Sequence, residues 1–210
     1  MKISILGAGN MGSAFVKQLT RAGHQVSVAS KDGIKATQVA AANPGAKAVL
    51  ATGAAEGADV VVLATPFADA AAVLQAAGDL TGKVVIDITN PLTADYMGLT
   101  IGHSTSAAEE IAKAVPGAEV VKAFNTLFAQ VLAEGADFGG GQQVTVFVAG
   151  DSERAKQSAA ALAESMGFRV VDAGGLKNAR YLEPLAGLNI YLGYGAGLGT
   201  AIAPTWIRKA

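Results

Sequence analysis

Short apolar runs alternate with longer segments of helical spacing along the first 124 residues of the chain. Two of the runs, 59–64 and 83–88, are almost continuously apolar, which is typical of strands covered on both faces of a sheet. The alternation predicts an α/β fold, a doubly wound parallel sheet with helices on both faces. The expected strands are 2–6, 26–29, 48–51, 59–64, 83–88 and 119–124, and the expected helices are 11–22, 31–42, 68–77 and 104–115.

The pattern changes after the glycine turn at residues 139–141. A strand at 143–149, a helix from Asp151 or Ser152 to Met166 and a strand at 168–172 are predicted to extend the sheet. We therefore divide the chain into a first domain, residues 1–138, and a small C-terminal α/β extension, residues 139–210.

Residues 184–207 carry no charge, and an uncharged run of this length is a candidate membrane helix. Its five glycines and Pro204, together with Asn189 and two threonines, instead favour a buried, Gly-rich helical tail from about Asn178 onward. Such a tail would pack against a twofold-related copy, because soluble monomers avoid large exposed apolar patches. Packing of the tail against a bound ring is the alternative explanation of the glycines.

The composition argues against several classes of function. The chain has 16 Lys and Arg residues against 17 Asp and Glu residues, which argues against a nucleic-acid partner. It has no cysteine, and its two histidines, His24 and His103, are far apart, so no metal site is expected. The first residues lack the long apolar stretch of a signal peptide, which favours a cytoplasmic protein without a membrane partner.

The segment Gly7-Ala8-Gly9-Asn10-Met11-Gly12 fits the pattern G-x-G-x-x-G between the first expected strand and the first expected helix. In this context the pattern is typical of a dinucleotide site, where the glycines allow a tight turn, close approach of a pyrophosphate and close helix packing. The helix N-terminus then stabilises the phosphate charge. This arrangement is a Rossmann domain.

The end of the second expected strand indicates which dinucleotide is bound. An NAD site places Asp or Glu there to bind the ribose hydroxyls, but this chain has Ala29-Ser30-Lys31. Ser30, Lys31 and Lys35 offer the donors that a 2′-phosphate requires, which favours NADP(H). The alternative is that both lysines are ordinary surface residues, and the neighbouring Asp32 weakens the case slightly.

Ligands in open α/β sheets lie across the carboxyl ends of the strands. We expect the residues that follow these ends to surround the nicotinamide, although the two prolines could simply terminate strands. These residues are Ala64, Thr65, Pro66, Phe67, Asn90, Phe124 and Asn125. We assign no catalytic acid or base, because hydride transfer between two bound rings requires mainly their juxtaposition and the exclusion of water.

Several segments together resemble a known family. They are ILGAGNMG, VASKDGIK, LATPF, VVIDITNP, TSAAEEIAKAVPGAEVVKAFNT and the long block from Val146 to Ile190. The chain resembles the NADPH-dependent reductases of the deazaflavin coenzyme F420 and the cytosolic domain of the six-transmembrane metalloreductases, which passes electrons from NADPH to flavin. The resemblance implies a homodimeric oxidoreductase that binds NADP through the glycine loop, Ser30, Lys31 and Lys35. It also implies a second ring near Pro66 and Ala123-Phe124-Asn125.

The resemblance leaves the small-molecule acceptor open. Phe124-Asn125-Thr126 and the segment from Asp87 to Pro91 are closer to the flavin-using relatives, so FMN, FAD and a deazaflavin are all considered. An imine or hydroxyacid reductase is a second hypothesis, although few residues follow Ala149 to build its helical domain. A non-catalytic NADP-binding sensor or regulatory module is the third.

Overall fold

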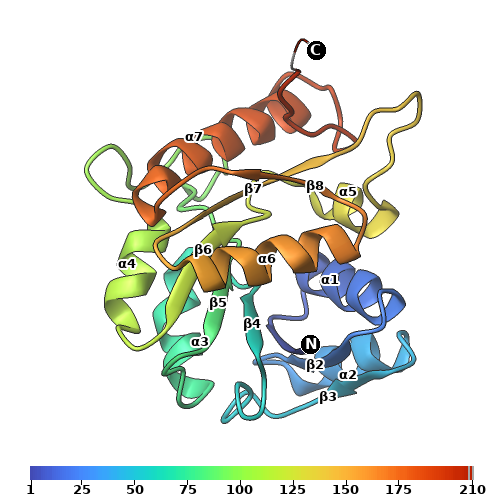
Figure 1. Ribbon diagram of the computed structural model, residues 1–210, viewed down its shortest axis with the longest axis vertical. Helices are drawn as coiled ribbons and strands as arrows, with labels where there is room; N and C mark the ends of the chain where they lie inside the picture. Colours follow the sequence, from blue (N-terminus) through green and yellow to red (C-terminus); the bar gives the residue numbers. More distant parts are fainter. Residues whose placement is uncertain (208, 210) are drawn as a thin grey trace.

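Eight strands form one sheet in the computed structural model, which describes residues 1–207 and 209 (Figure 1). The strand order β3-β2-β1-β4-β5-β6 is that of a dinucleotide-binding domain, and β7 and β8 continue the sheet beyond β6. The predicted α/β fold class is confirmed. The strands are β1 (Lys2–Leu6), β2 (Gln25–Ala29), β3 (Ala46–Ala48), β4 (Val60–Leu63), β5 (Val84–Asp87), β6 (Glu119–Ala123), β7 (Thr145–Gly150) and β8 (Arg169–Asp172).

The expectation of a fully parallel sheet is wrong for one pair. β7 runs antiparallel to β6, with Val121 opposite Gly150, while every other neighbouring pair is parallel. A parallel connection needs a crossover of a dozen or more residues, usually a long helix. Residues 124–144 join β6 to β7 and are long enough for a crossover, but they contain only the six-residue α5 (Ala129–Glu134) and loops. No long helix carries the chain back across the sheet, and β7 starts from the end at which β6 finishes.

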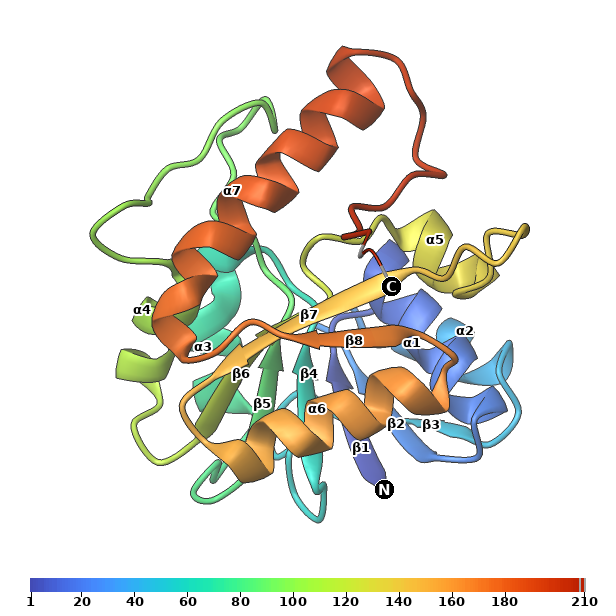
Figure 2. The ribbon, with the colours of Figure 1, turned by 45° about the horizontal axis from the view of Figure 1, so that its top comes forward.

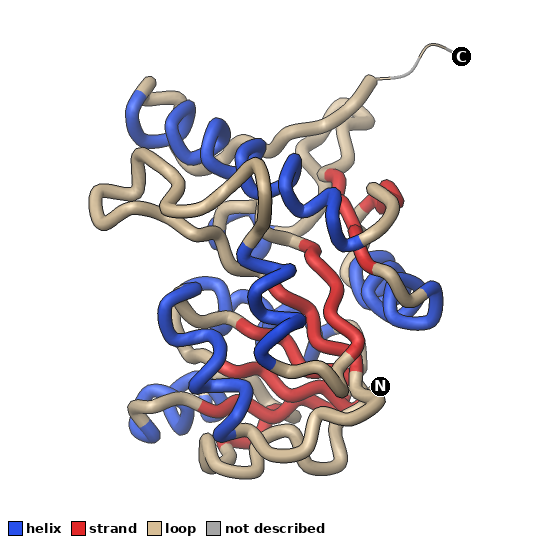
Figure 3. Tube along the Cα trace, turned by 90° about the vertical axis from the view of Figure 1, so that its left-hand side faces the viewer, coloured by secondary structure: helices blue, strands red, loops and turns tan. Residues whose placement is uncertain are grey.

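Helices cover both faces of the sheet (Figure 3). Alternate residues of the strands point to opposite faces: Ile3 and Ile5 pack in the cluster that contains Phe15 of α1, while Leu6 and Val61 pack in the other. The first face carries α1, α2, α5 and α6, the second α3 and α4, and α7 packs on β7. The remaining bounds are α1 (Asn10–Arg21), α2 (Gly33–Ala41), α3 (Ala70–Ala76), α4 (Ala107–Ala114), α6 (Glu153–Ser165) and α7 (Ala179–Ile190), with the short turns η1 (Phe67–Asp69), η2 (Leu176–Asn178) and η3 (Tyr191–Gly195).

Local capping explains where the elements begin. α4 starts at Ala107 rather than at residue 104, because the Ser106 hydroxyl accepts the N–H of Glu109 as its N-cap. Ser152 caps α6 in the same way, as one of the two predicted alternatives. The third strand was expected at 48–51 but lies at Ala46–Ala48, directly after the turn at Gly45, and α5 was not predicted.

The C-terminal tail is helical over a shorter stretch than predicted. α7 and the π-helical turn η3 end at Gly195, and residues 196–207 return to the sheet without regular structure (Figure 2). There the ring of Trp206 packs edge-on against Phe147, with ring centroids 5.1 Å apart. The tail is also not fully buried, since Leu188 and Tyr191 are more than half exposed. Among the described residues, no helix combines the length and apolar character that crossing a membrane requires.

Candidate functional site

The glycine turn joins β1 to α1 at the carboxyl edge of the sheet, as the sequence predicts. A side chain on Gly12 would overlap the carbonyl oxygen of Gly7, so the helix can approach the strand only with glycine there. A side chain on Gly9 would meet no protein atom within 4 Å, which leaves that position open to a ligand. No side chain caps the N-terminus of α1, so its first N–H groups are free to bind an anion such as a pyrophosphate.

A cavity of about 660 Å³, here called the nucleotide cavity, lies on the β2 side of this turn. Ser30, Lys31 and Lys35 all line it, together with Gly7, Ala8 and Gly9. Asp32 lines it too, but its carboxylate accepts the N–H groups of Ile34 and Lys35 at the start of α2. The cavity therefore offers two ammonium groups and a hydroxyl to an anion. Of the two acids that line it, Asp32 is engaged as a helix cap, and Asp69 lies in the turn η1 that leads into α3.

Other residues of the nucleotide cavity were missed by the sequence analysis. Ala51, Ala72, Val73 and Ala76 form an apolar part of its lining. Small and apolar residues of this kind suit a flat ring. The only sequence signal for them was the unusual run of alanines in the segment that forms α3.

A second cavity, of about 240 Å³ and here called the acceptor cavity, lies on the other side of the turn. Asn10 and Met11 form its edge with the glycine turn, and the ends of β5 and β6, α5, α7 and η3 enclose it. No carboxylate, imidazole or ammonium belongs to the described residues that line it. The lining residues are Asn10, Met11, Asn90, Tyr96, Asn125, Thr126, Leu127, Phe128, Ala129, Ala186, Asn189, Ile190 and Tyr194.

Amide groups dominate the polar part of the acceptor cavity. Asn90 and Asn125 bond to each other twice, since Asn90 Nδ2 donates to the Asn125 carbonyl and Asn125 Nδ2 donates to Asn90 Oδ1, both at 2.9 Å. Asn189 Nδ2 donates to the Thr126 carbonyl at 3.1 Å. Asn125 Oδ1 is buried and has no partner among the described residues. Buried acceptors are rarely left unpaired, so this atom is suited to accept an N–H from a ligand.

Phe124, the residue before Asn125, does not line the cavity but lies in the core next to it. It is fully buried and has a φ of +59°, a region that bulky residues rarely adopt. Its ring lies edge-on to Phe15 and to Phe168, with centroids 5.0 and 6.3 Å away. This packing holds the backbone in its uncommon conformation and turns Asn125 toward the cavity.

The structure divides the predicted nicotinamide residues into three groups. Ala64, Thr65 and Pro66 line the nucleotide cavity, while Asn90 and Asn125 line the acceptor cavity. Phe67 packs against the apolar cluster beside α3, and Ala123 is fully buried, as is Phe124. Direct contact of these three residues with a ligand stays a prediction.

A buried ionic cluster holds the strand ends in place beneath the acceptor cavity. Lys122 Nζ lies 2.6 Å from Asp87 Oδ2 and 2.9 Å from Glu183 Oε1, and it donates to the Thr89 carbonyl at 2.7 Å. Glu183 also accepts the N–H groups of Ala107 and Ala108 at the start of α4. The cluster joins the ends of β5 and β6 to α4 and α7. Its members are widely separated in the sequence, and the sequence analysis did not identify them.

Comparisons with known proteins identify relatives of this chain. Residues 2–91 match the family model described as "NADP oxidoreductase coenzyme F420-dependent". The chain is 34% identical to the F420-dependent NADP reductase of Methanothermobacter marburgensis, over 91% of this chain and 92% of that protein. A solved structure from Arthrobacter sp. FB24, described as a candidate F420-dependent NADP reductase, is 31% identical with a TM-score of 0.87, covering 99% of this chain and 100% of that one.

A relative from the metalloreductase family is much longer than this chain. The metalloreductase STEAP3 of Rattus norvegicus is 30% identical over 88% of this chain, which spans only 36% of that protein. Both families that the sequence resembles are therefore found among its relatives.

Proposed function

Because this chain belongs to the family of F420-dependent NADP reductases, we propose that it transfers hydride between NADP(H) and a flavin or deazaflavin ring. The nucleotide cavity would hold the adenosine half of NADP(H), with the 2′-phosphate at Ser30, Lys31 and Lys35. The acceptor cavity would hold the nicotinamide and the second ring face to face.

One observation carries this proposal: the two cavities meet at the glycine turn. Gly7, Ala8 and Gly9 line the nucleotide cavity, and the next two residues, Asn10 and Met11, line the acceptor cavity. A dinucleotide whose pyrophosphate sits at the N-terminus of α1 would therefore have its two ends in cavities of different chemistry. The end with the lysines suits a phosphate, and the end with amides and aromatic rings suits flat heterocycles.

Hydride transfer between two bound rings requires no protein acid or base, and the described residues that line the acceptor cavity include none. NADPH supplies the hydride when it is bound. The chain's own contribution is to orient the rings and exclude water, and Phe128 and Tyr194, whose centroids are 5.6 Å apart, provide an apolar wall for this purpose.

The amides of the acceptor cavity support a flavin-type acceptor. The pyrimidine ring of a flavin or deazaflavin presents an N–H group between two carbonyl groups. The unpaired Asn125 Oδ1 could accept such an N–H, and the Asn10 amide, at the open edge of the cavity, could donate to a carbonyl. FMN, FAD and F420 share this ring edge, so the edge does not distinguish among them.

Anaerobic stopped-flow measurements test the proposal. NADPH bound to the protein should lose its absorbance on mixing with FMN, FAD or F420, and remain stable without an acceptor. Asn125→Asp should slow the reaction, because a carboxylate beside the ring opposes the build-up of negative charge on the acceptor. Tight NADPH binding without oxidation by any flavin or deazaflavin would instead indicate a sensor, and oxidation only by imines would indicate an imine reductase.

A further inference from the structure

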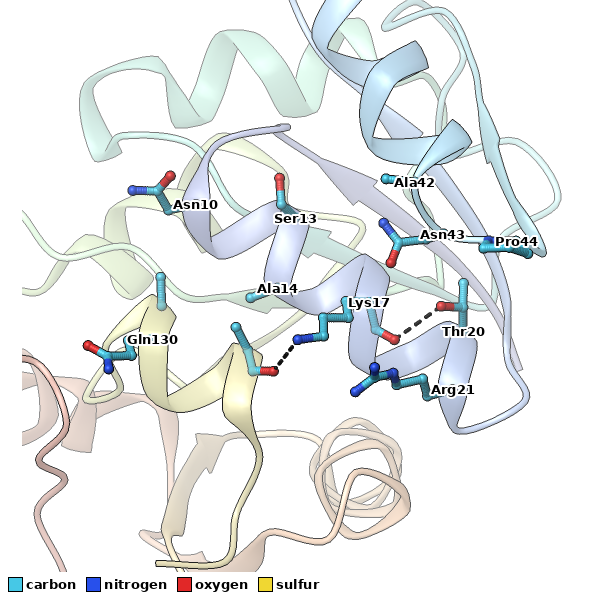
Figure 4. Close-up of a pocket in the computed structure, with 12 residues that line it drawn as sticks. Asn10, Ser13, Ala14, Lys17, Thr20, Arg21, Ala42, Asn43, Pro44 and Gln130 are labelled. Atoms are coloured by element: carbon cyan, nitrogen blue, oxygen red, sulfur yellow. Dashed lines mark hydrogen bonds between the residues drawn. The ribbon is translucent and has the colours of Figure 1, made fainter.

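A further concave surface of the described structure lies outside the nucleotide cavity and beside the acceptor cavity. It is a groove of about 790 Å³ that follows α1, between the turn after α2 on one side and α5 on the other (Figure 4). Asn10, Ser13, Lys17 and Arg21 follow one another along α1 within it, and Asn43 and Gln130 face it from the two sides. We call it the α1 groove.

The charged side chains of the α1 groove are all positive. Lys17 Nζ donates to the Ala133 carbonyl at 2.9 Å. Among the described residues, no carboxylate lies within ion-pair distance of Lys17 or Arg21, and none lines the groove. Lys17 is partly buried, so its charge is less well hydrated than that of an extended surface lysine. The groove therefore has an excess of positive charge that a bound anion would balance.

The groove adjoins the acceptor cavity. Asn10 and Ala129 line both of them, so the two spaces meet at the N-terminal ends of α1 and α5. Lys17 follows Asn10 by seven residues, roughly 10 Å along the helix axis. A ring in the acceptor cavity that carries a short chain of several bonds could thus bring the end of that chain to the Lys17 ammonium.

We propose that the α1 groove binds a phosphate-bearing side chain of the acceptor, with Lys17 and Arg21 as its counter-charges. This inference rests on the proposed function, because it assumes that the ring occupies the acceptor cavity. Such a groove favours flavins and deazaflavins that carry a phosphate ester, as FMN, FAD and F420 all do, over those that end in an uncharged sugar alcohol. Ammonium and guanidinium groups one helical turn apart can both form charge-assisted hydrogen bonds with the oxygens of one phosphate.

The test compares FMN with riboflavin, which has the same ring and sugar chain but no phosphate. Affinity is measured by quenching of flavin fluorescence with NADP⁺ present, and turnover by NADPH oxidation. The wild-type protein should prefer FMN by about tenfold or more, and Lys17→Met or Arg21→Met should reduce this FMN-to-riboflavin ratio by about tenfold. Raising the ionic strength should also reduce the ratio, because salt screens exposed charges.

Two further variants separate the charge effect from a structural one. Lys83→Met is the matched control, since Lys83 also donates to a backbone carbonyl, that of Ala58, but lies away from the groove; it should leave the ratio unchanged. Gln130→Glu adds a negative charge to the groove without altering Lys17 and should also lower the ratio. This variant keeps the test valid if Lys17→Met fails to fold.

The outcomes distinguish the inference from the proposed function. Equal affinity of the wild-type protein for FMN and riboflavin, or an equal loss of both in Lys17→Met and Gln130→Glu, would overturn the groove assignment even if flavins are reduced. Flavins that bind with the expected ratio but are not reduced would overturn the proposed reaction and leave the groove assignment supported. Competition by inorganic phosphate against both flavins alike would show a general anion site and also contradict the assignment.

Discussion

Two neighbouring charges beside the nucleotide cavity have different roles. Asp32 caps α2, with its Oδ1 atom 3.0 Å from the backbone nitrogen of Ile34, so its charge is compensated by the helix N-terminus. Lys31 forms no ion pair with the described residues and lines the cavity. In the sequence, the negative charge of Asp32 weakened the case for NADP(H). The structure shows that the helix N-terminus compensates this charge, so Asp32 no longer weakens that case.

We predict that NADPH binds more tightly than NADH and that Lys31→Ala removes most of the difference. A hydrogen bond to a charged group contributes about 1.5–3 kcal/mol, which corresponds to roughly a ten- to hundredfold change in affinity at 1.4 kcal/mol per tenfold. NADH has no phosphate there, so its affinity should change little. Titrations of both nucleotides at one salt concentration measure this, with the exposed Lys47→Ala as control. Equal affinity of the wild-type protein for the two nucleotides would contradict the NADP assignment.

The glycine turn gives a second residue-scale prediction. Gly9→Ala should leave the thermal unfolding temperature nearly unchanged but weaken NADPH binding, because the added methyl group projects toward the ligand and meets no protein atom. Gly12→Ala should destabilise the protein by about 1–3 kcal/mol, because its methyl group overlaps the Gly7 carbonyl and α1 must move. Thermal unfolding with and without NADPH separates the two effects. A destabilised Gly9→Ala variant with normal NADPH affinity would be inconsistent with this geometry.

At the scale of elements, α7 is fixed to α4 by two ionic contacts of different kinds. Inside, Glu183 of α7 reaches the buried Lys122 and the N-terminus of α4. Outside, Arg180 of α7 forms two hydrogen bonds with Glu109 of α4, at 2.7 and 2.8 Å. Because α7 contributes Ala186, Asn189 and Ile190 to the acceptor cavity, these contacts also determine the shape of that cavity.

The outer contact predicts a pH-dependent stability. Hydrogen bonds from Arg180, and to a lesser extent from Ser106, lower the pKa of Glu109 below its ordinary value of 4.5. The contribution of Glu109 is therefore fully present above about pH 4.5 and is lost as the pH falls through its lowered pKa. Glu109→Gln should cost on the order of 1 kcal/mol at pH 7, and the difference from wild type should shrink toward pH 3.

Urea unfolding at both pH values measures this difference. Glu164→Gln, which removes an exposed carboxylate from α6, is the control and should change stability little at either pH. A Glu109→Gln effect of the same size at pH 7 and pH 3 would show that the ionic interaction with Arg180 is not its cause.

At the scale of the whole molecule, an apolar stripe on α7 and the start of η3 is exposed. Tyr181, Leu188 and Tyr191 are 74%, 55% and 52% exposed, and Pro184 lies between them on the same face. Their spacing of three and four residues is that of a helix seam packed against another helix. No charged residue interrupts the stripe after Glu183, which itself points inward.

We therefore predict a homodimer in which α7 packs against its copy in a second chain. Leu188→Glu places a charge in the middle of the stripe and should shift the protein to a monomer at micromolar concentration. Light scattering after size-exclusion chromatography measures the mass. Leu50→Glu, at another exposed leucine far from α7, should leave the mass unchanged. A wild-type protein that is monomeric at this concentration would contradict the prediction.

The sequence by itself determined the features that depend on neighbouring residues. The strands, most helices and the glycine turn follow from local periodicity and from the few backbone conformations that glycine allows. The position of Ser30, Lys31 and Lys35 at the nucleotide cavity followed too, because the end of the second strand has a fixed place relative to that turn. The division at residue 138 stays a prediction, since β7 and β8 continue the same sheet.

Asn90 and Asn125 were predicted for the acceptor side from the ends of their strands, but only the tertiary structure decided the shape of the acceptor cavity and its other walls. The reversed direction of β7, the short α5 and the return of the tail from Gly195 depend on packing between distant segments, which periodicity cannot report. Lys122 meets Asp87 and Glu183 across 35 and 61 positions of the chain, and the α1 groove joins helices more than 100 residues apart. Local sequence specifies which conformation a segment prefers, whereas a cavity is the space left between segments, and its shape exists only once they have packed.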